Sequence, residues 1–261
     1  MKKDRILLFI PAYNCEDQVV RVLSQLEGEV LEYIDEVLVI NNRSTDGTEE
    51  AVLSFKREHP EVPLKLLRNE ENYGLGGSQK VAFSYAIEND FDYAIILHGD
   101  DQGNIRDFLP VFRKKYYVYY DSVLGARFMR GSRLEGYSMV RTLGNIVYDF
   151  LFAAVLKRRV FDLGSGLNLY DVRSLKNGYY KRFPDDLTFN YCMVMADGYY
   201  KHSVRFFPIS WRETDQVSNV KLTSQAKKVL KMLFDYFKDP SSIEDEYRDK
   251  LVNEYRAEEI L

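Results

Sequence analysis

Side chains that could hold a metal ion cluster at residues 98–102, directly after the short apolar run 93–97. They read His98-Gly99-Asp100-Asp101-Gln102. An imidazole, two carboxylates and an amide beside a buried strand cost free energy unless they bind something. Oxygen ligands suit Mg²⁺ or Mn²⁺ bridging a diphosphate, so we expect Asp100 and Gln102, with His98, to hold such an ion. His98 and Asp101 are also expected to contact the ligand, and a solvated turn is the alternative interpretation.

Polar side chains also follow the first two apolar runs of the chain. The run 6–10 leads into Pro11-Ala12-Tyr13-Asn14, and the run 36–40 leads into Asn41-Asn42-Arg43-Ser44-Thr45-Asp46-Gly47-Thr48. Such groups can read a base or ribose edge by hydrogen bonds, although Ser44–Gly47 also has the composition of a turn and helix cap. The candidate ligand-binding residues here are Pro11, Tyr13, Asn14, Glu16, Asn41, Asn42 and Ser44.

A glycine-rich segment follows the third apolar run, 64–67. It reads Asn72-Tyr73-Gly74-Leu75-Gly76-Gly77 and precedes a helical pattern. Glycine permits close approach of the backbone to a partner, and the start of a helix favours an anion. We therefore expect Asn72, Gly76, Gly77 and Lys80 to contact the ligand, with plain turn geometry as the alternative.

The spacing of the apolar runs predicts the elements that position these groups. Strands are expected at 6–10, 36–40, 64–67 and 93–97, and helices at about 16–28, 48–59 and 77–89. This alternation favours an α/β fold with a mostly parallel, Rossmann-like sheet, whose ligand site lies at the carboxyl ends of the strands. Further on we expect strands at 118–125, 167–170 and 204–209, a loop at 127–141, an apolar helix at 143–156 and a helical tail from 214, broken near 239–242.

Composition narrows the class of protein. The 261 residues carry a net charge of -4, so the chain as a whole does not attract nucleic acid. Cys15 and Cys192 are the only cysteines, which excludes a disulfide framework and fits a reducing cytoplasm. Pro11 ends the first apolar run too early for a signal peptide, and no stretch reaches the roughly 18 apolar residues of a membrane span. We expect a cytoplasmic protein, either soluble or peripheral on the inner face of the membrane.

Together and in this order, the four motifs resemble those of family 2 glycosyltransferases with the GT-A fold. The resemblance is closest to the dolichyl-phosphate mannosyltransferase and polyprenyl-phosphate glycosyltransferase branch, and it covers about residues 5–212. Gly125-Ala126-Arg127-Phe128 resembles the branch's Gly-x-Arg-aromatic motif, and Asp162 with Ser165-Gly166 resembles its Asp-x-x-Ser-Gly motif. The resemblance implies a GT-A domain at 1–212, a helical extension at 213–261, and inverting, metal-dependent transfer of a sugar, expected to be a hexose, from a nucleotide-diphosphate donor.

The chain departs from that family pattern at several positions. Asn41 replaces an Asp that contacts the donor base, and the Asp-x-Asp motif becomes His98-x-Asp100, which leaves one carboxylate. Asn168 replaces an Arg suited to a lipid phosphate. A later Arg-to-Ser motif is echoed only by Arg212 and Ser218. These departures keep a non-catalytic sugar-nucleotide-binding protein as a rival interpretation.

Two acceptor classes imply different catalytic residues. A polyprenyl phosphate is already ionised and needs cations, for which Arg127, Arg130, Arg133 and Arg141 are candidates. A hydroxyl acceptor of a soluble glycan needs a base, for which Asp185 or Asp186 is the candidate, unless they cap a helix starting near Leu187. We favour the lipid-linked acceptor of cell-surface glycan synthesis. The apolar helix 143–156 with Lys157-Arg158-Arg159, and the basic amphipathic stretch 221–238, could lie on a membrane, or could pack on the domain or in a homo-oligomer.

Overall fold

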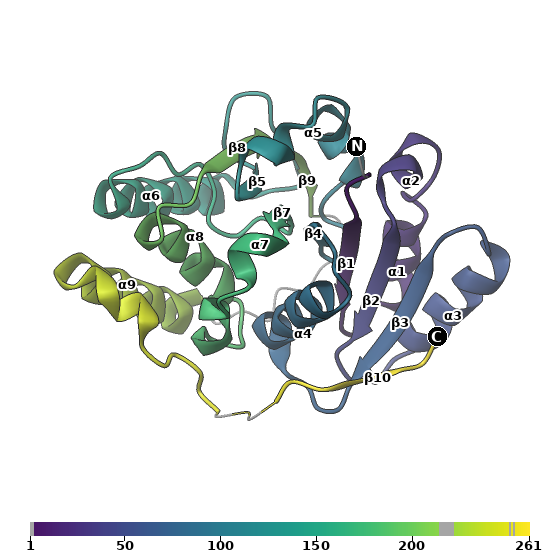
Figure 1. The fold of residues 1–261 in the computed structure, drawn as a ribbon. Helices are drawn as coiled ribbons and strands as arrows, with labels where there is room; N and C mark the ends of the chain where they lie inside the picture. Colours follow the sequence, from purple (N-terminus) through teal and green to yellow (C-terminus); the bar gives the residue numbers. More distant parts are fainter. Residues whose placement is uncertain (1–2, 214–221, 251, 253) are drawn as a thin grey trace.

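A buried sheet of eight strands organises the part of the chain that the structure describes, which is residues 3–213, 222–250, 252 and 254–261 of a computed structural model (Figure 1). The strands of this sheet are, in the order in which they lie side by side, β10 (Ala257–Glu259), β3 (Leu64–Asn69), β2 (Glu36–Asn41), β1 (Ile6–Ala12), β4 (Tyr93–Leu97), β7 (Leu167–Asp171), β5 (Ser122–Ala126) and β8 (Val204–Pro208). Strands β1 to β4 are parallel, and β7 runs antiparallel to both β4 and β5. The predicted mostly parallel α/β sheet is confirmed.

Helices cover both faces of this sheet (Figure 1). Alternate residues of each central strand point to opposite faces, so Leu7 and Phe9 of β1 pack into one core while Leu8 and Ile10 pack into the other. The second core also contains residues of α1 (Glu16–Leu23), α2 (Glu29–Tyr33), α3 (Thr48–Glu58) and α5 (Leu109–Arg113). The first core contains residues of α4 (Gly74–Glu88), α6 (Met139–Leu156), α7 (Val172–Leu175), α8 (Phe189–Tyr199) and α9 (Leu222–Lys238). Four 3₁₀ turns complete the described elements: η1 (Ile105–Phe108), η2 (Tyr116–Tyr119), η3 (Tyr179–Arg182) and η4 (Pro240–Glu244).

Two of the described segments differ from the elements expected from the sequence. The strand expected at 118–125 begins at Ser122, because η2 occupies the residues before it. The loop expected at 127–141 contains a short strand, β6 (Arg133–Glu135), which pairs with β9 (Ser210–Arg212) and is therefore stabilised by residues far along the chain. Ser218 and Lys221 lie outside the described residues.

The C-terminal extension ends in a strand as well as containing a helix. After α9 and η4 the chain runs back across the molecule, and β10 pairs antiparallel with β3 at the edge of the sheet (Figure 1). The sequence of β10, Ala-Glu-Glu, has no apolar alternation from which a strand could be predicted. The division at residue 212 stays a prediction, and in the structure the last strand of the extension joins the main sheet.

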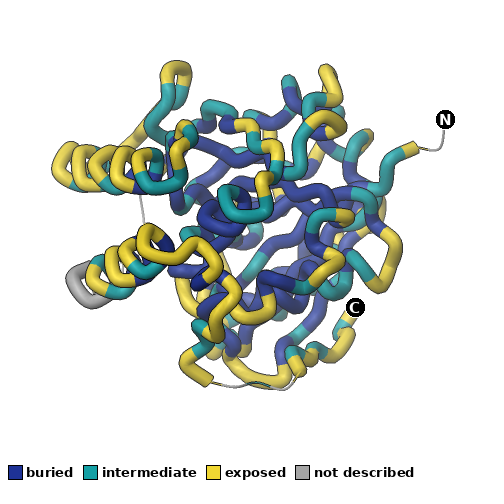
Figure 2. Tube along the Cα trace, turned by 60° about the vertical axis from the view of Figure 1, so that its left-hand side comes forward, coloured by how far each residue is buried: buried dark blue, intermediate teal, exposed yellow. Residues whose placement is uncertain are grey.

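Helix α6 is apolar and largely exposed. It begins at Met139 rather than at residue 143, so it reaches 18 residues, has a mean hydropathy of 1.4 and is only 11% buried. Among the described residues it is the one helix long and apolar enough to cross a membrane, judged by length and composition alone, which corrects the expectation that no stretch reaches that length. Figure 2 shows helices projecting from the body with largely exposed surfaces. The exposed apolar residues of α6 are Met139, Val140, Leu143, Ile146, Val147, Phe150 and Leu151.

We predict that two phenylalanines on α6 differ sharply in their effect on stability. Phe152 is fully buried, so Phe152→Ala should lower the free energy of unfolding by about 3–5 kcal/mol. Phe150 is 73% exposed, and Phe150→Ala should change that free energy by no more than about 0.5 kcal/mol. Urea denaturation of the two variants and the wild type measures both effects, and equal losses would contradict the described orientation of α6.

Candidate active site

Two cavities meet at the carboxyl ends of the central strands. The strand-end cavity, of about 450 Å³, is lined by Pro11, Ala12, Tyr13, Cys15, Asn42, Asn72, Gly74, Leu75, Ser78, His98, Gly99, Asp100, Asp186 and Leu187. The helix cavity, of about 400 Å³, is lined by Leu75, His98, Arg127, Tyr137, Val140, Arg141, Gly144, Asn145, Tyr148, Gly164, Leu187, Asn190, Tyr191, Ala226 and Val229. Both include Leu75, His98 and Leu187, so the two cavities share a wall.

The strand-end cavity collects residues that the sequence placed after three different strands. Pro11 lies near the end of β1 and Tyr13 follows that strand, Asn42 follows β2, and His98 with Asp100 follows β4. Asn42 is buried and holds the next loop, because its side-chain oxygen accepts hydrogen bonds from Asn69 Nδ2 (2.8 Å) and from the Tyr73 amide (2.9 Å). Its own amide donates to Asn72 Oδ1 at 2.8 Å. The predicted convergence of these groups at one edge of the sheet is present in the structure.

Of four other residues predicted to contact the ligand, three join the loops after β1 and β2 to each other, and the fourth, Asn41, bonds residues that follow β2. Asn14 Oδ1 accepts a hydrogen bond from the Thr45 amide (2.8 Å), and Ser44 Oγ accepts one from the Asn14 amide (3.0 Å). Glu16 Oε2 accepts one from the Gly47 amide at 3.1 Å. The Asn41 amide group is also occupied, since its oxygen accepts from the Ser44 amide and its nitrogen donates to Glu49. These residues support the cavity rim and do not line the cavity.

The glycine turn approaches the protein's own backbone. The amides of Gly76 and Gly77 both donate to the carbonyl oxygen of Asp185, at 2.8 and 3.3 Å. A methyl group added at Gly76 would collide with the carbonyl oxygen of Pro184, and Gly74 adopts a φ of +71° that favours glycine. The close approach expected from the sequence is therefore to residues 184–185, and these glycine amides are not free to hold an anion.

Lys80 and Asp101 are also paired within the protein. Lys80 is 1% exposed, and its Nζ donates to the carbonyl oxygen of Phe183 (2.5 Å) and to Asp185 Oδ1 (2.6 Å). Burial lowers the pKa of Lys80, while Asp185 acts in the opposite direction. Asp101 is buried and forms ion pairs with Arg21 (2.6 Å) and Arg212. Neither residue lines either of the two cavities, and their expected contacts with a ligand stay predictions.

His98 and Asp100 face each other at the junction of the two cavities. His98 Nδ1 lies 4.0 Å from Asp100 Oδ2, and Asp100 Oδ1 accepts a hydrogen bond from the Gln102 amide. The imidazole is fixed against Gly166, where an added methyl would lie 2.7 Å from the ring. Burial lowers the pKa of His98 and raises the pKa of Asp100, so charge on either group is disfavoured. A bound cation would reverse that preference for Asp100.

The donor set at this junction fits a divalent ion that is shared with another ligand. Among the residues that the structure describes, no three His, Cys, Asp or Glu side chains lie close enough to hold a metal by themselves. The Nε2 atom of His98 is buried without a hydrogen-bond partner. The other ring nitrogen, Nδ1, is the atom that faces the carboxylate of Asp100. Gln102 contributes its backbone to the turn, and it lines neither cavity. His98 and Asp100 therefore supply at most two ligands.

The two later motifs meet in the wall of the helix cavity. Arg127 makes a bidentate pair with Asp162 through Nε (2.7 Å) and a terminal nitrogen (2.8 Å). Its guanidinium also lies 4.9 Å from the centre of the Trp211 ring, in cation–π contact. Although burial acts in the opposite direction, Asp162 raises the pKa of Arg127, so this residue is a permanent cation. Arg141 lines the same cavity and pairs with Glu213 at 2.6 Å.

Other expected acceptor residues lie elsewhere. Arg130 and Arg133 are exposed and line neither cavity. Asn168 is buried in β7, where its side-chain oxygen accepts hydrogen bonds from the Gly125 amide and from Ser165 Oγ. The Asn168 side chain therefore bonds neighbouring residues within the sheet. It lines neither cavity.

Both candidate bases are already paired with lysines. Asp185 accepts hydrogen bonds from Lys80 and from the hydroxyl of Tyr255 (2.7 Å). Asp186 lines the strand-end cavity, accepts hydrogen bonds from the amide and hydroxyl of Thr188, and pairs with Lys228 Nζ at 2.9 Å. Although burial opposes it, the hydrogen bonds from Thr188 and Lys228 lower the pKa of Asp186. The alternative that Asp186 caps the start of α8 fits these contacts.

Several cavity residues were not anticipated from the sequence. On α6 they are Gly144, Asn145 and Tyr148, which with Arg141 recur at helical spacing and form one stripe. The polar residues Arg141 and Asn145 within a mostly apolar helix were the available signal. Asn190, Tyr191, Ala226 and Val229 come from α8 and α9, whose approach to the cavity depends on tertiary packing.

Comparison with known proteins places this geometry in a family. The chain is 27% identical over 176 residues to an uncharacterized protein of Methanocaldococcus jannaschii, covering 67% of this chain and 68% of that one. It is 23% identical over 181 residues to the UDP-N-acetylglucosamine–dolichyl-phosphate N-acetylglucosaminyltransferase of Methanococcus voltae, covering 66% of this chain and 71% of that enzyme.

Solved structures share the fold at low sequence identity. Glucosyl-3-phosphoglycerate synthase from Mycobacterium tuberculosis, in complex with Mn²⁺, UDP-glucose and glycerol 3-phosphate, superposes with a TM-score of 0.63 at 16% identity, covering 90% of this chain and 80% of that chain. A mannosyltransferase from Pyrobaculum calidifontis, in complex with GDP-mannose and Mn²⁺, superposes with a TM-score of 0.58 at 18% identity, covering 84% and 59%. The predicted GT-A fold is thereby confirmed. Residues 8–178 match glycosyl transferase family 2, and the chain belongs to that family.

Proposed function

We propose that the chain transfers a sugar from a nucleoside-diphosphate donor to a lipid-linked phosphate, by direct displacement with inversion at the anomeric carbon. The observation that carries the proposal is the helix cavity. It brings the cations Arg127 and Arg141 beside a largely apolar wall from α6 and α9, and it opens next to the exposed apolar face of α6. Cations that can bind the phosphate of a lipid acceptor thus lie next to an apolar surface that can bind its hydrocarbon chain.

The donor belongs in the strand-end cavity. Solved neighbours support this class of donor, since they contain UDP-glucose or GDP-mannose with Mn²⁺. His98 and Asp100 would hold the cation together with the diphosphate, and the cation supplies neutralisation of the negative charge that develops on the leaving group. In this arrangement the anomeric carbon of the donor would lie at the wall that the two cavities share, near His98 and Leu187, and would face the acceptor.

The pairing of the two acidic residues favours an acceptor that is already ionised. A hydroxyl acceptor requires a base with a pKa near the working pH. Asp186 has a lowered pKa and is neutralised by Lys228, and Asp185 is shared between Lys80 and Tyr255. Each of the two carboxylates is therefore already paired with an ammonium group. A phosphate needs only orientation by Arg127 and Arg141, because its oxygen is already a nucleophile.

The outer face of α6 is suited to contact a membrane, from which a lipid-linked acceptor would come. Its exposed side chains include Met139, Leu143 and Phe150, and cations follow at Lys157 and Arg159. Helix α9 packs beside α6 and adds the exposed apolar residues Leu230, Phe234 and Phe237. Apolar residues flanked by cations are typical of a helix that lies in the interface of an anionic bilayer. The relative from Methanococcus voltae is named for a dolichyl-phosphate acceptor, which supports the same class.

We predict that an oxygen ligand at residue 98 strengthens cation binding. In His98→Asp a carboxylate replaces the imidazole beside Asp100, and the concentration of Mn²⁺ that gives half-maximal transfer should fall roughly tenfold, because hard cations prefer oxygen. Turnover at saturating Mn²⁺ should be retained. A Mn²⁺ titration of sugar transfer measures both quantities.

Asp100→Asn is the matched comparison for that titration. It keeps the size of the side chain and removes its charge, so turnover should fall about a hundredfold or more even at saturating Mn²⁺. Near-wild-type turnover of Asp100→Asn, or inactivity of His98→Asp at every Mn²⁺ concentration, would overturn the assignment of this pair as cation ligands.

We also predict that the exposed face of α6 binds anionic vesicles. The double variant Leu143→Ser, Phe150→Ser removes two exposed apolar side chains, each worth about 1.5–3 kcal/mol when buried, so partitioning should weaken at least roughly tenfold. Flotation with vesicles containing phosphatidylglycerol measures it. Tyr119→Ser, which changes an equally exposed residue in η2, is the control and should float like the wild type. Equal flotation of the double variant, or none of the wild type, would contradict membrane docking through α6.

A further inference from the structure

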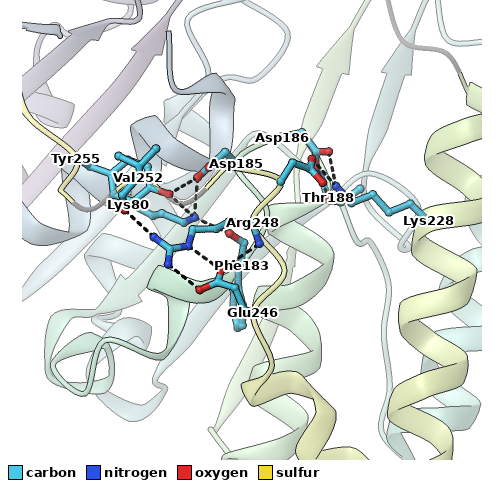
Figure 3. A network of polar contacts seen from close by, with 11 residues as sticks. Lys80, Phe183, Asp185, Asp186, Thr188, Lys228, Glu246, Arg248, Val252 and Tyr255 are labelled. Atoms are coloured by element: carbon cyan, nitrogen blue, oxygen red, sulfur yellow. Dashed lines mark hydrogen bonds and ion pairs between the residues drawn. The ribbon is translucent and has the colours of Figure 1, made fainter. Parts of the chain in front are cut away.

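A polar cluster around the buried Lys80 joins the C-terminal strap, here the described residues of 246–261, to the wall of the candidate active site (Figure 3). At its centre lies the ammonium of Lys80, which donates to the Phe183 carbonyl oxygen, to Asp185 Oδ1 and to the Tyr255 hydroxyl oxygen (3.1 Å). Tyr255 OH in turn donates to the same carboxylate oxygen at 2.7 Å. One residue of the strap therefore completes the environment of a buried ion pair.

Tyr255 is itself held from three sides. Its ring packs edge-on against Tyr73 with the ring centres 5.3 Å apart, and it lies 4.9 Å from Lys80 Nζ in cation–π contact. Its hydroxyl is also hydrogen-bonded to Arg248, which makes a bidentate pair with Glu246 within the strap (Figure 3). Two residues later, Ala257 begins β10 and pairs with Asn69 at the end of β3. The position of the hydroxyl is thus set by the main sheet.

The carboxylate that Tyr255 holds belongs to a segment that forms the cavity wall. The carbonyl oxygen of Asp185 accepts the amides of Gly76 and Gly77, which presses residues 184–185 onto the start of α4. The next two residues, Asp186 and Leu187, line the strand-end cavity, and Leu187 lines the helix cavity too. Any shift of Asp185 moves the wall that both cavities share.

We propose that Tyr255 is a positioning residue: through Asp185 it fixes the Asp186–Leu187 wall, so the C-terminal strap sets the shape of the ligand site. The inference rests on the proposed function only for the chemical class of the ligand. The wall contacts the donor equally before and during transfer, so loosening it weakens donor binding more than it slows turnover.

The test compares two substitutions, each of which removes the hydroxyl of one tyrosine in the strap. Tyr255→Phe keeps the ring and removes the hydrogen bond to Asp185. The matched control is Tyr247→Phe, because the Tyr247 hydroxyl donates only to the carbonyl oxygen of Ser242 within η4 (2.8 Å). Amide hydrogen exchange of the ligand-free proteins gives a readout that needs no substrate. We expect the amides of Gly76 and Gly77 to exchange roughly tenfold faster in Tyr255→Phe and at the wild-type rate in Tyr247→Phe.

Titration with UDP-glucose and with GDP-mannose, each with Mn²⁺, then measures donor binding. Tyr255→Phe should raise the donor Kd and KM about fivefold while kcat stays near that of the wild type. Wild-type exchange at Gly76 and Gly77 in Tyr255→Phe, or an equal rise across all helices, would overturn the inference. A local rise in exchange, with no nucleotide sugar bound by the wild type, would uphold the positioning role and contradict the proposed function instead.

Discussion

The buried ammonium of Lys80 is the constraint on which the rest of the site depends. A lysine that is 1% exposed must find a carboxylate, since an unpaired charge in the interior costs several kcal/mol and breaking such a pair about 3–5 kcal/mol. Asp185 meets that need, and its carbonyl oxygen takes the two amides of the glycine turn. The loop at 184–187, the start of α4 and the C-terminal strap are therefore held together as one unit beside the cavities.

This constraint also determines what chemistry is left for the site. Asp185 is paired with Lys80 and Asp186 with Lys228, and the lining of the two cavities also includes His98, Asp100 and the cation Arg127. Such a set can bind and polarise phosphates on both sides of a transferred sugar. It is suited to an acceptor that arrives ionised, and α6 presents the apolar surface from which a lipid-borne phosphate could enter.

Local patterns in the sequence were sufficient to predict the strands β1 to β4 and the approach of the motifs that follow them. The apolar runs of β1 to β4 are contiguous, so their ends and the convergence of Asn42, His98 and Asp100 could be predicted from chain order. The partners of Lys80 and Asp101 could not, because Phe183, Tyr255 and Arg212 lie 103, 175 and 111 residues away in the chain. Strand β10 has no alternation of its own and exists because β3 offers an open edge. The exposure of α6 is likewise a property of tertiary packing, since an apolar helix of the same composition could have been a core helix.

The measurement that bears most directly on this account compares two acceptors that differ only in the phosphate. A polyprenyl phosphate and the matching polyprenol, each in anionic vesicles, are incubated with the protein, Mn²⁺ and a radiolabelled nucleotide sugar, and label in the lipid fraction is followed with time. The account predicts label in the phosphate only, because the two candidate bases, Asp185 and Asp186, are each paired with a lysine. Label in the polyprenol at a comparable rate, abolished by Asp186→Asn, would contradict it.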